Sequence, residues 1–249
     1  MTVALAVAGA LIGAIVGSFI ATLCIRWPRG EQATAGRSKC DGCGRPLAAF
    51  ELVPIASGLL ARGKCRTCGA PIDPFHMKVE LAAAAIGATA LAIAPDLRGA
   101  ALALFCWLLL APAILDARHH WLPDRLTAAL AIAGLAAGGL LSGVPLLHRL
   151  IGGVAGFCFL ALLAIGYRRA RGREGLGAGD AKLLGAIGLW TGWAALPAIL
   201  LIASVTGLAS AAVERRGRLE AVAFGSLLAF AAAIWSVAVL LFPGLGGAR

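Results

Sequence analysis

Residues 99–116 read Gly99-Ala-Ala-Leu-Ala-Leu-Phe-Cys-Trp-Leu-Leu-Leu-Ala-Pro-Ala-Ile-Leu-Asp116, an apolar run that carries no charge until its last residue. As a helix, such a run approaches the roughly 20 residues that cross the hydrocarbon core of a bilayer. Similar runs recur along the chain without the alternation of a barrel strand. They predict a bundle of about eight transmembrane helices, the sixth of them short, at residues 3–25, 79–95, 99–116, 125–143, 147–167, 182–194, 196–213 and 221–243.

The composition excludes a soluble globule. Hydrophobic residues make up 60% of the 249 residues and charged residues only 14%, and the mean hydropathy is +0.90. So few polar side chains cannot cover a globule of this size. We therefore predict an all-α polytopic membrane protein. The first run has no basic segment before it and no small-residue cleavage site after it, so we expect an uncleaved helix at residues 1–25.

The basic residues predict the orientation of the helices. Of the 22 Lys and Arg residues, 19 lie in four segments that alternate spans place on one side, namely 26–78, 116–125, 168–182 and 214–220. The turns between them hold only Arg98 and Arg149. The positive-inside rule then puts the four segments in the cytoplasm and the N-terminus outside. Basic loops beside an anionic leaflet account for the net charge of +10, so we expect the lipid bilayer and no nucleic acid as a partner.

The segment 26–78 contains two Cys-x-x-Cys motifs, Cys40-Asp-Gly-Cys43 and Cys65-Arg-Thr-Cys68. Two such motifs supply the four thiolates of a tetrahedral zinc site. Two disulfides are the alternative, which the reducing cytosol disfavours, and a redox pair lacks the βαβ setting of that chemistry. A loop of this size cannot fold on apolar burial alone, so a structural metal suits it. We predict a small cytoplasmic zinc-ribbon-like domain at 26–78, between the first helix and a multi-helix membrane domain at 79–249.

Three aspartates stand near the predicted cytoplasmic edge. Asp116 ends a span, where the helix dipole disfavours a carboxylate, so function explains it better than structure does. Asp180 follows a run of alternating glycines, which permit irregular backbone at the membrane edge. Asp124 follows Pro123, where its side chain is expected to cap the next helix. Two acids on the same side indicate general acid/base chemistry, in which Asp116 is expected to hold a proton and Asp180 a charge.

Together these segments resemble the type IV prepilin peptidases, which are membrane aspartic peptidases with a Gly-x-Gly-Asp motif. The resemblance covers most of the chain. It rests on the two cysteine motifs and on Gly17-Ser-Phe-Ile, Arg26-Trp-Pro28, Val79-Glu80, Asp116, Leu122-Pro-Asp-Arg-Leu-Thr127 and Glu174-Gly-Leu-Gly-Ala-Gly-Asp-Ala-Lys-Leu-Leu184.

The resemblance implies an enzyme of the bacterial inner membrane that removes the basic leader of type IV prepilins or pseudopilins after a glycine, at the cytoplasmic face. Asp116 and Asp180 would be catalytic, and Gly177, Gly179 and Lys182 would form a supporting loop. Family members with the cysteine loop often also methylate the new N-terminus. S-adenosylmethionine is therefore an expected second cofactor beside structural zinc.

Other interpretations remain open at this point. Glu80 is the one candidate for a role in methylation, and a charge near a helix N-terminus explains it about as well. A proton-coupled transporter is the alternative function, because intramembrane acids also serve ion pathways. A transporter would place acids near the bilayer midplane, whereas both acids here lie at its edge. A zinc-ribbon interaction module anchored in the membrane is the third possibility. If the chain is a peptidase, its pattern fits pili, type II secretion and DNA uptake alike.

Overall fold

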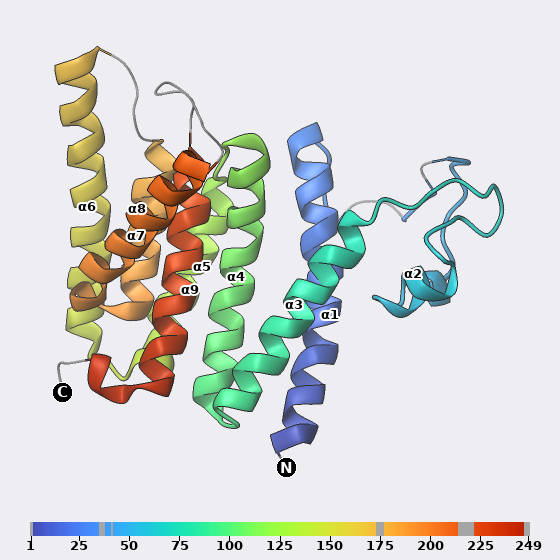
Figure 1. Ribbon diagram of the computed structural model, residues 1–249, viewed down its shortest axis with the longest axis horizontal. Coiled ribbons are helices and arrows are strands. Elements are labelled where there is room, and N and C mark those ends of the chain that lie inside the picture. Colours follow the sequence, from blue (N-terminus) through green and yellow to red (C-terminus); the bar gives the residue numbers. More distant parts are fainter. Residues whose placement is uncertain (1, 35–37, 41, 173–176, 214–221, 247–249) are drawn as a thin grey trace. The chain divides into compact units, whose positions relative to one another are not determined.

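The computed structural model describes residues 2–34, 38–40, 42–172, 177–213 and 222–246 (Figure 1). These residues form helices and two isolated β-bridges, Lys39–Pro46 and Lys64–Pro71. The chain divides into two compact units, Met1–Ala92 and Ile93–Arg249. The predicted segment 214–220 lies outside the described residues, as does the Glu174–Gly175 part of the glycine run.

Each predicted span corresponds to one long helix. The helices are α1 (Thr2–Arg26), α3 (Phe75–Ile93), α4 (Leu97–His119), α5 (Asp124–Ser142), α6 (Leu146–Arg171), α7 (Ala178–Thr191), α8 (Leu196–Val213) and α9 (Phe224–Leu241). Seven helices among the described residues are long and apolar enough to cross a membrane, so the protein is a multi-pass membrane protein. The remaining one, α7, has 14 residues and a length of about 21 Å, short of the hydrocarbon thickness.

In the first unit, α1 and α3 pack through small residues. A Cβ atom at Gly13 would collide with the backbone carbonyl of Ala83, and one at Gly17 would lie 2.7 Å from the Cα of Glu80. Glycines four residues apart let two helix backbones approach this closely, as is common in membranes. The cysteine segment joins the two helices and carries the short elements η1 (Trp27–Arg29), η2 (Ala49–Leu52) and α2 (Ala56–Leu60).

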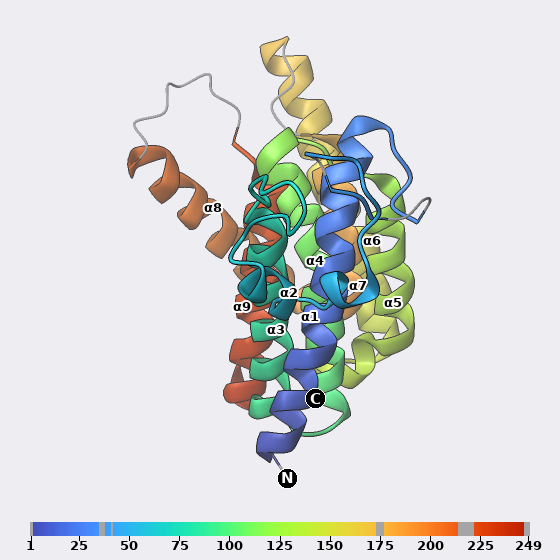
Figure 2. The same cartoon turned by 90° about the vertical axis from the view of Figure 1, so that its right-hand side faces the viewer.

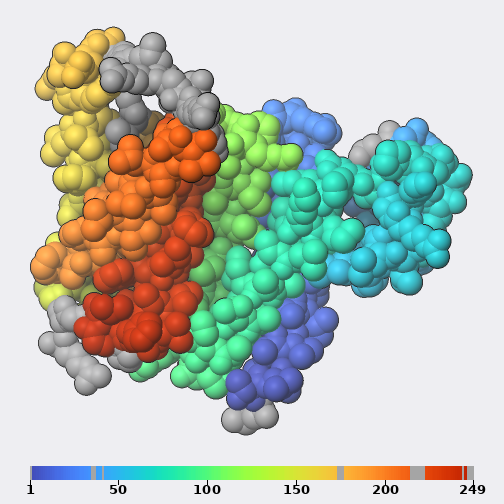
Figure 3. Space-filling model, in the orientation of Figure 1, coloured from blue at the N-terminus to red at the C-terminus, as the bar shows by residue number. Residues whose placement is uncertain are grey.

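In the second unit, α7 packs against α5 and α6, while α9 packs against α4 and α8. Figure 3 shows α8 (orange) and α9 (red) side by side on one face. The α4–α5 connection, the start of α7 and the start of α9 lie at the same end of this unit (Figures 1 and 2). This arrangement agrees with the prediction that these connections lie on the same side of the membrane. The orientation of the N-terminus stays a prediction.

Arg149 holds the short helix α7 in place. The charge pattern counted Arg149 with the turns, and that part of the expectation was wrong: Arg149 is buried in the first turn of α6, inside the predicted span 147–167. Its guanidinium donates to the carbonyls of Gly134 (2.7 Å), Leu189 (3.3 Å) and Val144 (3.2 Å). These carbonyl oxygens replace the hydrogen bonds to water that the cation loses on burial. This network joins α5, α6 and α7.

Candidate active site

The structure brings the two predicted acids together. Asp116 lies in the last turn of α4 and Asp180 in the first turn of α7, and only 6% of each residue is exposed. A Cβ atom on Gly225 would lie 3.0 Å from Asp180 Oδ1 and 3.1 Å from Asp116 Oδ2. The two carboxyl oxygens therefore lie no farther apart than these two distances combined.

Helix α9 completes the surroundings of Asp116. The backbone N–H of Ser226 donates to Asp116 Oδ2 at 2.7 Å. The positive end of the α9 dipole thus faces a carboxylate at the unfavourable end of α4. Sequence reasoning missed Gly225 and Ser226, because they lie inside an apolar run. The one weak signal was a Gly-Ser pair at its beginning.

Glycines and one leucine shape the other side of the pair. A Cβ atom on Gly179 would lie 2.7 Å from Leu122 Cβ, and one on Gly225 would lie 2.7 Å from Leu122 Cδ1. Leu122 therefore packs against both glycines next to the carboxyl groups. Among the residues predicted to form a supporting loop, Gly177 precedes α7 as its N-cap residue, whereas Gly179 and Lys182 belong to the helix itself.

Asp124 has a different role from the one we expected. The prediction that its side chain caps a helix was wrong, because Pro123 occupies the N-cap position and Asp124 is the first residue of α5. Its carboxylate accepts a hydrogen bond from Lys182 Nζ at 2.6 Å, with 73% of the side chain exposed. An exposed pair of this kind contributes about 0–1 kcal/mol. Asp124 thus stands apart from the buried pair and links α5 to α7 at the surface.

The four predicted metal ligands also come together. The sulfur atoms of Cys40, Cys43, Cys65 and Cys68 all lie within 4.8 Å of one another. The Cys40 and Cys68 sulfurs are 3.8 Å apart, close to the roughly 3.8 Å between thiolates at a Zn–S distance of about 2.3 Å. None of these four thiols is part of a disulfide. The cluster therefore fits a closed tetrahedral metal site and could hold zinc.

The two motifs fold alike around this centre. The amide of Gly44 donates to the Cys40 carbonyl, and the amide of Gly69 donates to the Cys65 carbonyl. Both glycines have a positive φ, near 70°, which favours glycine at these turns. Amides of Cys68 and Thr67 donate to the Cys65 sulfur and lower the pKa of its thiol to about 6. The thiolate is the form that binds a metal.

An ion pair supports the second motif. Arg45 donates to both carboxylate oxygens of Glu51, at 2.6 Å and 2.8 Å. This bond, together with one from the Ala48 amide, lowers the pKa of Glu51 to about 2. The guanidinium also lies 4.0 Å from the Cys65 sulfur. Such a forked contact fixes the distance between η2 and the cysteine cluster.

Comparison with known proteins identifies the family. The model of the type IV leader peptidase family matches residues 102–212, and that of the bacterial peptidase A24 N-terminal domain matches residues 11–94. A prepilin leader peptidase/N-methyltransferase of Dickeya chrysanthemi is 35% identical over 79% of this chain and 71% of its own length. The chain belongs to the type IV leader peptidase family. The first match contains Asp116 and Asp180, and the second contains all four clustered cysteines.

Other relatives with the same name support the assignment. The protein of Burkholderia pseudomallei strain 1026b is 43% identical over 78% of this chain, and that of Klebsiella pneumoniae is 36% identical over 67% of it. The chain spans 64% of the length of the Burkholderia protein and 74% of the Klebsiella protein. The transporter alternative finds no support among these relatives. No solved structure matches the chain.

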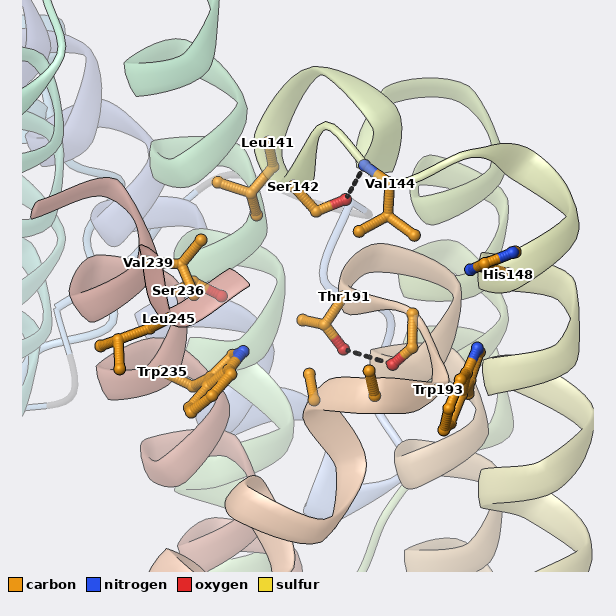
Figure 4. A pocket seen from close by; sticks show the side chains of 13 residues that line it. Leu141, Ser142, Val144, His148, Thr191, Trp193, Trp235, Ser236, Val239 and Leu245 are labelled. Carbon is orange, nitrogen blue, oxygen red and sulfur yellow. Dashed lines mark hydrogen bonds between the residues drawn. The ribbon is translucent and has the colours of Figure 1, made fainter. Parts of the chain in front are cut away.

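Figure 4 shows the side chains that line a cavity of about 90 Å³. The cavity adjoins the end of α7, whereas Asp180 of the acid pair lies in the first turn of that helix. Its walls come from the α5–α6 and α7–α8 connections and from α9, with Trp193, Trp235 and Ser236 among the lining residues. No acidic residue lines it. It therefore does not belong to the carboxyl pair of this peptidase family member.

Proposed function

We propose that this protein is an aspartic endopeptidase of the bacterial inner membrane that removes the basic leader of type IV prepilins or pseudopilins after a glycine. The observation that carries the proposal is the position of Asp116 and Asp180, whose carboxyl oxygens lie within about 3 Å of one point beside Gly225. Burying two carboxyl groups this close together destabilises the folded protein, and a catalytic role accounts for their presence there. The names of the relatives supply the substrate class.

The reaction follows from the chemistry of a close carboxyl pair. Two carboxyl groups at short range share one proton, because both cannot ionise cheaply. The ionised aspartate takes a proton from water, and the resulting hydroxide attacks the scissile carbonyl. The protonated aspartate donates its proton to the carbonyl oxygen, which gives a tetrahedral intermediate that is not bonded to the protein. The other aspartate then passes the proton that it took from water to the leaving amine nitrogen, the hydroxyl of the intermediate returns a proton to the first aspartate, and the carbon–nitrogen bond breaks.

The shared proton belongs to the pair. The dipole of α4 favours the proton on Asp116, whereas the Ser226 amide at the start of α9 favours the charge there. These opposing influences weaken the assignment of the proton to Asp116 that the sequence suggested. We treat the two groups as one titrating unit.

The cysteine segment would hold a structural zinc ion through Cys40, Cys43, Cys65 and Cys68. Its geometry supports this part of the proposal, as does the size of the segment. The names of the relatives support a second activity, in which S-adenosylmethionine supplies a methyl group to the new N-terminal amine. Glu80, our one candidate for that step, is buried and accepts a hydrogen bond from the Ile55 amide at 2.7 Å. This contact gives Glu80 a structural reason to be there.

The test is cleavage of a prepilin leader peptide by the purified full chain in lipid nanodiscs. Asp116→Asn and Asp180→Asn should each abolish cleavage, and the double variant should be scarcely worse than either, because members of one catalytic unit are strongly non-additive. Asp124→Asn is the matched control and should cleave at close to the wild-type rate. Normal cleavage by Asp180→Asn would refute the mechanism. Inactivity of Asp124→Asn beside an active Asp116→Asn would show that we chose the wrong partner.

A further inference from the structure

Large apolar side chains are exposed on the segment of residues 49–60, which contains η2 and α2. Leu59 is 62% exposed and Leu60 is 74% exposed, and Phe50, Leu52 and Val53 are each between 45% and 58% exposed. This segment lies outside the seven candidate spans. Five large apolar side chains exposed within twelve residues of a segment outside the candidate spans indicate a surface that contacts another apolar phase.

Contacts with α3 place this segment beside a membrane span. The Ile55 amide donates to Glu80 Oε2, and a Cβ atom on Gly58 would lie 3.3 Å from the terminal methyl of Met77. Glu80 stands five residues after Phe75, the first residue of α3, which is a helix long and apolar enough to cross a membrane. At 1.5 Å per residue, that position is about 7.5 Å along the helix axis. The contact therefore lies in the first two turns of α3, at the end of this helix that adjoins the cysteine segment, where an interfacial segment would lie.

The backbone at Ile55 shows that this contact is specific. Ile55 has a φ of 63° and ψ of −54°, and the Ala56 amide donates to the Pro54 carbonyl at 2.6 Å. This is the rare, strained form of the γ-turn, and a β-branched residue tolerates it poorly. Such a conformation persists only where its surroundings hold it. The buried Glu80 carboxylate supplies the holding contact.

Charge follows directly after the apolar side chains. Arg62, Lys64 and Arg66 are exposed, and the Arg66 guanidinium lies 5.2 Å from the ring centroid of Phe50. Residues 26–78 as a whole contain nine Lys or Arg and four Asp or Glu residues. A basic segment next to a bilayer is attracted to anionic headgroups. Long Lys and Arg side chains can extend from an apolar segment to place their charged ends among these headgroups.

We infer that residues 49–60 form an interfacial anchor in the leaflet beside the cysteine segment. Leu52, Val53, Leu59 and Leu60 enter the outer acyl region, while Arg62, Lys64 and Arg66 bind anionic headgroups. The bilayer is the occupant that the structure favours, because the segment contacts the first turns of a candidate span and exposed basic residues follow its apolar side chains. The anchor holds the cysteine cluster at the membrane surface, and this inference does not depend on the proposed peptidase activity.

Fluorescence quenching in the full chain tests the anchor. A dansyl-bearing amino acid replaces Leu60, and the protein is placed in nanodiscs of phosphatidylcholine with phosphatidylglycerol. The matched control carries the same probe at Thr67, an exposed side chain on the second cysteine motif. We expect nitroxide-labelled lipid to quench the Leu60 probe at least about threefold more than the Thr67 probe, and acrylamide to quench it at least about threefold less. The probe at Leu59 repeats the measurement in case the Leu60 variant misfolds.

Charge removal separates headgroup binding from apolar insertion. In anionic discs, Arg62→Gln and Lys64→Gln should each lower the ratio of membrane-inserted to solvent-exposed Leu60 probe about fivefold, measured by the same quenching. In pure phosphatidylcholine the two changes should have little effect on this ratio. Equal access of acrylamide to the Leu60 and Thr67 probes would overturn the inference. Shielding of the Leu60 probe only after a prepilin peptide is added would also overturn it, and would identify the surface as a peptide-binding site.

Discussion

Gly225→Ala tests the geometry of the carboxyl pair most directly. The added methyl would lie 3.0 Å from Asp180 Oδ1, 3.1 Å from Asp116 Oδ2 and 2.7 Å from Leu122 Cδ1. The leucine methyl can yield, whereas the two carboxyl oxygens are held on α4 and α7. The methyl therefore crowds both oxygens and the space for water next to them.

Gly225→Ala is expected to change both the stability of the protein and the rate of cleavage. Overpacking costs about 1–3 kcal/mol, and the better helix propensity of alanine offsets up to about 1 kcal/mol of this. Displacement of a reacting group by even 1 Å can cost about 100-fold in rate. We therefore expect Gly225→Ala to fold and insert but to cleave a leader peptide at least about 100-fold more slowly than the wild type.

Gly207→Ala provides a matched control. A Cβ atom there would also lie 2.7 Å from a leucine methyl, Leu227 Cδ1, but no carboxyl oxygen is among its near neighbours. Both variants should lose a similar amount of thermal stability, and only Gly225→Ala should lose activity at matched protein levels in nanodiscs. Near wild-type cleavage by Gly225→Ala, or an equal loss in Gly207→Ala, would refute the reasoning.

Three further predictions concern the rest of the chain. The purified protein should contain about one zinc ion per chain by elemental analysis, and replacing Cys40 and Cys65 by serine should release it; unchanged zinc would exclude the proposed coordination. Arg149→Met should destabilise the protein by about 1–3 kcal/mol in thermal unfolding, because buried carbonyls lose their donor, and Arg149→Lys should recover part of the loss; an unchanged midpoint would contradict the role assigned to Arg149. A protease site inserted beside Pro95 should be cut only from the side of the inner membrane opposite the cytoplasm, and one inserted in the segment 26–34 only from the cytoplasm; cutting of both from one side would contradict the predicted orientation.

Much of the fold could be predicted because it is determined locally. A helix in a bilayer must satisfy its own backbone hydrogen bonds, so a long apolar run specifies a span wherever the rest of the chain lies. The cysteine cluster was similarly accessible, since two short motifs each bring two thiols to one centre. Asp116 was identifiable because no local structural role explains a carboxylate at the end of an apolar helix.

The partners of the polar side chains could not be predicted in the same way. Asp124 stands where a capping residue belongs, yet it pairs with Lys182, which is 58 residues away. Arg149 stands at the start of a predicted span, where a basic side chain is expected to face solvent, yet it is buried and donates to three carbonyls of other segments. Local preference is worth about 1 kcal/mol, and the packing of neighbouring helices can override it.

The sequence alone determined the class of the protein, the positions of its helices, the four clustered thiols and the two acids at one edge of the membrane. Only the tertiary structure decided that α9 completes the site, through the Ser226 amide bonded to Asp116 from 110 residues away and through the bare backbone of Gly225 beside both carboxyl groups. The physical reason is that apolar periodicity shows which segments become helices, whereas close packing at small residues selects which helix ends meet.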